Sequence, residues 1–160
     1  CVQICNYNCP GQLVIGGEKA AVDKAAALAK EAGARRCIPL KVSGPFHTRL
    51  MAPAGDALAK RFASEPFGEM QVPVLFNCLG HEMAQNDTVA TLLEKQVQYG
   101  VRWEATVRRL AELGVDTAIE IGPGRVLTGF VKKTVGNAIS CYPVETAAQL
   151  QQLLCTMKGA

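Results

Sequence analysis

The sequence predicts an α/β fold built in two parts, and three observations indicate it. From about residue 72 to the end, segments patterned as strands alternate with segments patterned as helices, which favours parallel strands joined by helices. Residues 72–78, VPVLFNC, form a short continuous apolar run, which is typical of a strand buried in a parallel sheet. Residues 1–43 instead follow the order strand, strand, helix, strand. We therefore expect a smaller lobe at 1–43 and a larger part at 44–160.

Local patterns predict each element of the first lobe. Residues 2–8 and 12–15 read as the strands of a hairpin around the turn Cys9-Pro10-Gly11. Residues 18–32 carry an alanine-rich face at helical spacing and are followed by a glycine, a common helix stop. Residues 37–42 are expected to be a third strand, at an edge or a bulge because the segment contains a proline. These elements make most of a ferredoxin-like unit, without its opening strand and helix.

The second part is predicted to continue with helices and strands in turn. Apolar residues at four-residue spacing predict a helix from the histidine at position 47 to about residue 64. After the strand at 72–78 we expect a polar loop at 80–86, and Asp87 as the cap of the next helix. The remaining elements are expected as helices up to 98 and at 103–113, 125–135 and 146–157, and as strands at 115–121 and 138–144.

Composition excludes several classes of function. The 160 residues suffice for one domain with a real core, and 49% hydrophobic and 19% charged residues are typical of a globular protein. A net charge of +3 without a basic run gives no support to nucleic-acid binding. No apolar run approaches the roughly 20 residues of a membrane span, and no signal peptide is visible.

The seven cysteines are odd in number and include no C-x-x-C pair. Cys1, Cys5 and Cys9 would share one face of the first strand, but they would lie too far apart to hold one metal ion, so no metal site is predicted. Reduced, mostly buried thiols indicate a cytoplasmic protein. Because Cys1 already lies inside a predicted strand, we expect the chain to be a piece of a longer protein.

His47 is the first candidate for chemistry. The stretch 42–51, VSGPFHTRLM, follows an apolar run, breaks at Gly-Pro, presents His47 and opens a helix. Many α/β enzymes place a general base in this way at the end of a sheet strand. The alternative is that His47 is only a polar residue at a helix start. The other histidine, His81, lies in the polar loop and is expected to be solvated.

Three other segments carry weaker signals. Gly122-Pro123-Gly124 matches no phosphate-loop motif and is expected to be a tight turn, although Glu120 before it would reach His47 if their strands were neighbours. Cys78 is either a thiol nucleophile facing His47 or a buried core cysteine. The amides in residues 6–12, NYNCPGQ, either hydrogen-bond their own turn or bind an uncharged polar ligand, such as a pantetheine arm or a base.

Four motifs, in this order and spacing, resemble one enzyme family over essentially the whole chain. They are NYNCPGQLVIGG at 6–17, VSGPFHTRLM at 42–51, QVQYGVRW at 96–103 and EIGPGRVLTGF at 120–130. Together they are similar to the C-terminal half of the malonyl-CoA:acyl carrier protein transacylases. The resemblance implies part of an α/β-hydrolase-like large subdomain, at 44–160, with an incomplete ferredoxin-like small lobe at 1–43.

The resemblance also implies a reaction. An acyl-serine forms from malonyl-CoA, and its malonyl group passes to the phosphopantetheine thiol of acyl carrier protein in fatty-acid synthesis. No cofactor is implied, because the coenzyme A thioester is the substrate. The serine elbow, the arginine for the malonyl carboxylate and the oxyanion-hole glutamine all fall in the missing N-terminal half. We therefore expect the isolated chain to be inactive and to self-associate. The alternative is a non-catalytic module that binds coenzyme A or pantetheine.

By motif match, the resemblance assigns roles to six residues. His47 is the general base, and the backbone carbonyl of Gln96 holds its imidazole in the working tautomer. Asn8 and Asn6 line the coenzyme A channel with Gln12 nearby. Phe46 resembles the residue that selects malonyl over methylmalonyl, because its ring would crowd an α-methyl group. One methyl group is worth about 1–3 kcal/mol of such discrimination.

Overall fold

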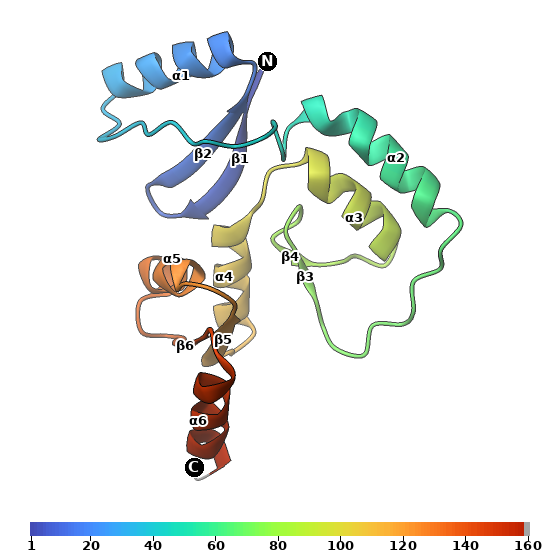
Figure 1. Ribbon diagram of the computed structural model, residues 1–160, viewed down its shortest axis with the longest axis vertical. Helices are drawn as coiled ribbons and strands as arrows, with labels where there is room; N and C mark the ends of the chain where they lie inside the picture. The colour runs from blue at the N-terminus through green and yellow to red at the C-terminus, as the bar shows by residue number, and fades with distance from the viewer. Residues whose placement is uncertain (159–160) are drawn as a thin grey trace.

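The structure of the chain is a computed structural model that describes residues 1–158. It mixes helices with short two-stranded sheets in an open arrangement (Figure 1), so the predicted α/β class is confirmed. The elements are β1 (Val2–Cys9), β2 (Gln12–Gly17), α1 (Lys19–Glu31), the 3₁₀ helix η1 (Arg49–Met51), α2 (Ala52–Phe62), β3 (Leu75–Phe76), β4 (His81–Glu82), α3 (Val89–Gln98), α4 (Trp103–Glu112), β5 (Thr117–Ile121), α5 (Val126–Val135), β6 (Ser140–Val144) and α6 (Ala147–Lys158).

The N-terminal hairpin and its helix form as predicted. β1 and β2 pair antiparallel around a turn in which Gly11 has φ +75°, a conformation that glycine adopts at little cost. α1 lies against this hairpin (Figure 1), and Ala25, Ala26 and Ala29 of its predicted face are half-buried. Local turn and helix signals were sufficient here because all the partners are close in sequence.

The third strand predicted at residues 37–42 is wrong. This segment runs without regular structure, and Ile38, Leu40 and Val42 are exposed. A strand forms only against a partner, and none of the described strands pairs with this segment. Only a hairpin and one helix of the expected ferredoxin-like lobe are therefore formed, and the lobe itself stays a prediction.

The predicted buried parallel strand at 72–78 is also wrong. Only Leu75 and Phe76 form a strand, and it pairs antiparallel with β4, inside the segment predicted as a polar loop. Val72, before it, is 68% exposed. Phe76, Cys78 and Leu92 instead form a small core beneath α3. α2 packs beside α3 (Figure 1).

The N-cap of α3 is one residue later than predicted. Thr88 caps the helix in a capping box with Thr91, whereas Asp87 accepts a hydrogen bond from the amide of Ala84. Both Asp and Thr are good N-cap residues, so the sequence alone could not choose between them.

The C-terminal part follows its prediction closely. β5 and β6 pair in parallel, joined by α5, as the alternation of strands and helices indicated. Val107 of α4, Val131 of α5 and Ile139 form the second core cluster. α6 packs on β6 and ends at the tip of the molecule (Figure 1).

Two backbone hydrogen bonds join the hairpin to the segment between α3 and α4. Val101, between α3 and α4, accepts a hydrogen bond from the amide of Tyr7 (2.8 Å) and donates one to the carbonyl of Cys5 (2.7 Å). β1 also contacts α4 and α5. The predicted lobes thus touch through β1, and their boundary at Gly44 stays a prediction.

No helix within residues 1–158 has the length and apolar character needed to cross a bilayer. The same residues contain no cluster of three or more His, Cys, Asp or Glu that could hold a metal ion. All seven cysteines are free thiols; Cys5, Cys9 and Cys78 are buried, but Cys155 is exposed, so burial of the thiols is only partial.

Candidate functional site

His47 lies in the loop before η1, next to the C-terminal end of α3, and it makes two hydrogen bonds to that helix. Its backbone amide donates to the carbonyl of Val97 (2.9 Å), and its Nδ1 atom lies 2.8 Å from the carbonyl oxygen of Gln96. The last carbonyls of a helix have no partner inside the helix. One residue from a distant loop therefore satisfies two of them.

This geometry determines the state of the neutral imidazole. A carbonyl oxygen can only accept, so Nδ1 carries the proton and donates it to Gln96. Nε2 is then left with a lone pair, which is the atom that a general base needs. His47 is half-buried, so that a reacting group can reach it. The expected contact between His47 and Gln96 is present, and its catalytic role stays a prediction.

The other residues assigned by resemblance lie near one another on the hairpin. Asn6 and Asn8 are two apart on β1, and Gln12 opens β2, where its side chain accepts a hydrogen bond from the thiol of Cys9 (3.6 Å). Within residues 1–158 the side-chain amides of Asn6 and Asn8 make no hydrogen bond, whereas the turn's side-chain bond joins Cys9 to Gln12, so the two asparagine side chains do not bind their own turn. They remain available to a ligand.

Residues 96–101 connect the His47–Gln96 contact with the asparagines of the hairpin. Gln96 holds His47, and Val101, five residues later, pairs with β1 beside Asn6. Gln3 of β1 also accepts a hydrogen bond from the backbone amide of Arg49 (2.8 Å), just after the histidine. The structure thus brings His47 and Gln96 into contact. Hydrogen bonds also join β1 to Arg49, which follows His47, and to Val101, which follows Gln96. In the described chain no hydrogen bond joins His47 to Asn6, Asn8 or Gln12.

Phe46 precedes His47 and is 47% exposed. Its ring lies near Gly44, where a Cβ would sit 3.5 Å from the ring edge. The ring is therefore not part of the core, and it is free to line a substrate site.

The Gly-Pro-Gly turn after β5 is not an anion cradle. The carboxylate of Glu120 accepts hydrogen bonds from the backbone amides of Leu127 (3.0 Å) and Thr128 (2.7 Å). The carboxylate of Glu145 accepts one from the backbone amide of Gly124 (2.7 Å). Burial raises the pKa of Glu120, but hydrogen bonds from residues 126–128 outweigh it and leave that pKa below its usual value. The tight-turn prediction is confirmed, whereas the suggested contact between Glu120 and His47 is wrong.

The remaining candidates have structural roles. Cys78 is 8% exposed, its thiol lies 3.6 Å from the carbonyl of Leu92, and burial raises its pKa. A buried protonated thiol is a poor nucleophile. His81 is exposed beside Glu82, as predicted.

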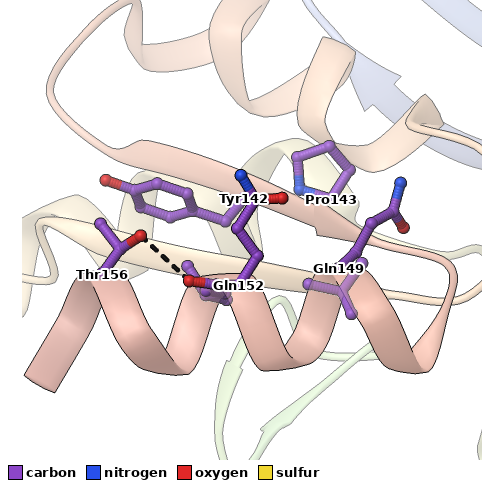
Figure 2. A pocket seen from close by; sticks show the side chains of 7 residues that line it. Tyr142, Pro143, Gln149, Gln152 and Thr156 are labelled. Carbon is purple, nitrogen blue, oxygen red and sulfur yellow. Dashed lines mark hydrogen bonds between the residues drawn. The ribbon is translucent and has the colours of Figure 1, made fainter.

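Two surface hollows are lined by residues of the C-terminal part and not by His47. The one in Figure 2 is about 270 Å³ and lies between β6 and α6. Its lining includes Tyr142, Gln149 and Gln152 but no His, Cys, Asp, Glu or Lys. The backbone carbonyl of Gln152 accepts a hydrogen bond from the hydroxyl of Thr156, which also lines the hollow. The other, of about 360 Å³, lies between α5 and the start of β6. Its lining includes Lys132, Ser140 and Cys141, so neither hollow includes a residue assigned by the resemblance.

Two residues important to this site were missed in the sequence. Thr48 is fully buried beside the histidine, and Gln3 binds the backbone that follows it. A threonine three residues after the proline of a turn is a recognisable signal for a side-chain-to-backbone hydrogen bond. No sequence pattern could indicate the role of Gln3, because its hydrogen-bond partner, Arg49, is 46 residues away.

Comparison with known sequences identifies similar proteins, although no family model matches the chain. It is 41% identical over 157 residues to the malonyl CoA-acyl carrier protein transacylase of Bacillus subtilis, an alignment that covers 98% of this chain and 49% of that protein. The chain spans about half the length of the curated relatives it matches.

Solved structures agree with the sequence comparison. The crystal structure of MCAT from Streptococcus pneumoniae superposes with a TM-score of 0.90 at 46% identity, covering 98% of this chain and 50% of that one. A second, PlMCAT in complex with the acyl carrier protein AntF, gives a TM-score of 0.91 at 42% identity, covering 98% and 50%. The fold of residues 1–158 is thus shared with half of each of these proteins.

Proposed function

The chain is a homologue of the malonyl CoA-acyl carrier protein transacylases, aligned with roughly their C-terminal half, and on that premise we propose that it supplies the general base of such an enzyme. The reaction moves malonyl from coenzyme A to the phosphopantetheine thiol of acyl carrier protein. The serine nucleophile lies outside the 160 residues. The observation that carries the proposal is the contact between His47 Nδ1 and the Gln96 carbonyl.

In the proposed mechanism, Nε2 of His47 takes the serine proton as the hydroxyl attacks the malonyl thioester. The C–S bond breaks, and the expelled coenzyme A thiolate takes the proton from the imidazolium, so that coenzyme A leaves as its thiol. In the second half, Nε2 takes the proton of the carrier thiol as that thiol attacks the acyl-serine, and the released serine oxygen regains the proton. The C-terminal end of α3 stabilises the imidazolium formed at each step, because the helix dipole is negative there.

The other assigned residues act in binding. We place Asn6, Asn8 and Gln12 along the channel for coenzyme A or the pantetheine arm, an assignment supported by the unused amides of the two asparagines. Phe46 restricts the acyl group to malonyl. No cofactor is needed beyond the thioester substrate, and we place the enzyme in the cytoplasm. The finer fold, a ferredoxin-like lobe beside an α/β-hydrolase-like subdomain, would be completed by the N-terminal half.

Labelling with radioactive malonyl-CoA tests this proposal. The full-length protein should acquire one malonyl group per chain and pass it to acyl carrier protein, whereas residues 1–160 alone should acquire none. A stoichiometric, hydroxylamine-labile adduct on residues 1–160 would contradict the proposal and point to a thiol nucleophile. A full-length protein that binds coenzyme A but is never acylated would instead favour a non-catalytic binding module.

A further inference from the structure

The backbone of His47 has an unusual conformation. Its φ is +64°, and among residues 1–158 it is the one non-glycine residue with a positive φ. Side chains other than glycine rarely occupy this left-handed region unless the surroundings hold them there. The turn therefore needs contacts that keep His47 in place.

Thr48 supplies such contacts from inside the turn. Its side chain is fully buried, with 0% exposure. The hydroxyl donates to the carbonyl of Pro45 (2.7 Å), before the histidine, and accepts from the amide of Leu50 (3.3 Å), after it. The γ-methyl group faces Gly16 of β2, where a Cβ would lie 3.6 Å away. A single hydroxyl thus closes the loop on both sides of His47.

From this geometry we propose that Thr48 is a positioning residue, which holds the imidazole of His47 against the Gln96 carbonyl through the hydroxyl bridge; the inference rests on the proposed function. Thr48 has no route to the substrate of its own, because it is buried. Its effect must therefore pass through the orientation of His47. Small misplacements of a catalytic group are costly, because the reacting atoms must align.

The test uses the full-length protein with Thr48→Val, which keeps the shape and removes the hydroxyl, and Thr48→Ser, which keeps the hydroxyl. Thr106→Val is the matched control, since Thr106 is also buried and donates to a backbone carbonyl, that of Arg102 (3.2 Å), in α4. We expect Thr48→Val to lower kcat about tenfold with little change in KM for malonyl-CoA. Thr48→Ser and Thr106→Val should leave kcat essentially unchanged.

A spectroscopic readout separates positioning from general destabilisation. In ¹⁵N spectra of the histidine ring, wild type should show the tautomer protonated at Nδ1, and Thr48→Val should show a mixture of tautomers. Equal losses of kcat in Thr48→Val and Thr106→Val, or an unchanged tautomer, would overturn the proposal. If Thr48→Val does not fold, Thr48→Ala carries the same expectation.

His47→Ala is measured in parallel, so that two failures can be told apart. If His47→Ala is inactive while Thr48→Val keeps full kcat, the positioning role is wrong and the proposed function stands. If His47→Ala keeps full activity, the proposed function itself is wrong.

Discussion

The Nδ1 atom of His47 lies 2.8 Å from the backbone carbonyl oxygen of Gln96, 49 residues further along the chain. In the described chain no carboxylate is hydrogen-bonded to this imidazole, so the end of a helix does the orienting that an acidic residue does in many hydrolytic triads. A positive charge near a helix C-terminus gains about 0.3–1 kcal/mol from the dipole. The helix therefore fixes the tautomer of the neutral imidazole.

Gln96→Ala should have little effect on the acylation rate of the full-length protein. The contact uses the backbone carbonyl, which the substitution keeps, and the rate should stay within about threefold of wild type. Stopped-flow acylation with malonyl-CoA measures this. A loss as large as that of His47→Ala would show that the side chain of Gln96 acts in the reaction.

Phe46→Ser should relax selection of the acyl group. Removing the exposed ring makes room for an α-methyl group, so kcat/KM for methylmalonyl-CoA relative to malonyl-CoA should rise about tenfold or more. Phe67→Ser is the control, because Phe67 is also exposed but packs edge-on against Phe62 at the end of α2. If both variants changed the ratio equally, Phe46 would have no special place at the site.

Glu120→Gln should destabilise the protein in a pH-dependent way. The substitution removes the charge and one of the two oxygens that accept the amides of Leu127 and Thr128 at the start of α5, which should lower the free energy of unfolding by about 0.5–2 kcal/mol at neutral pH. Because the pKa of Glu120 is lowered in the folded state, its stabilisation is present above the unfolded pKa, roughly 4.3, and is lost as the pH falls through the folded pKa.

Thermal melts of wild type and Glu120→Gln across the acid range test this. The difference in Tm should be largest at neutral pH and vanish in acid. Glu69→Gln is the control, since Glu69 is exposed in the loop after α2. A difference that grew towards low pH would mean that the cap is not the source of the effect.

The isolated 160-residue chain should self-associate. β5 has a partner only on its β6 side within the described residues, and Ile121 at its end is 81% exposed. Open strand edges and apolar patches recruit other chains. Sedimentation at micromolar concentration should show dimers or larger species, and Ile121→Lys should reduce them. A monomer that unfolds cooperatively would contradict this expectation.

The fold could be predicted where partners are local. The β1–β2 hairpin and α1 have their signals within a few residues of each other, and β5 and β6 are joined by one helix. The segments at 37–42 and 72–78 have strand-like composition, but composition does not supply a pairing partner, so neither forms the expected strand.

The candidate site, too, could be predicted from local patterns only in part. The turn before His47 could be recognised from its Gly-Pro break, but the contact with Gln96 was expected only from family resemblance, because no local pattern links the two positions. Thr48 was overlooked because a threonine at a helix start looks like an ordinary cap. Its bond to Pro45 is local, but its complete burial emerges only in three dimensions.

The central claim is that His47 is the base of a malonyl transfer whose nucleophile lies outside this chain, and one comparison tests it most directly. The rate of malonyl transfer from malonyl-CoA to acyl carrier protein is measured for the full-length protein, for His47→Ala and for His81→Ala, which removes the solvated histidine. We predict that His47→Ala lowers the rate by about 100-fold or more, while His81→Ala behaves as wild type. Transfer by His47→Ala at the wild-type rate would contradict the claim.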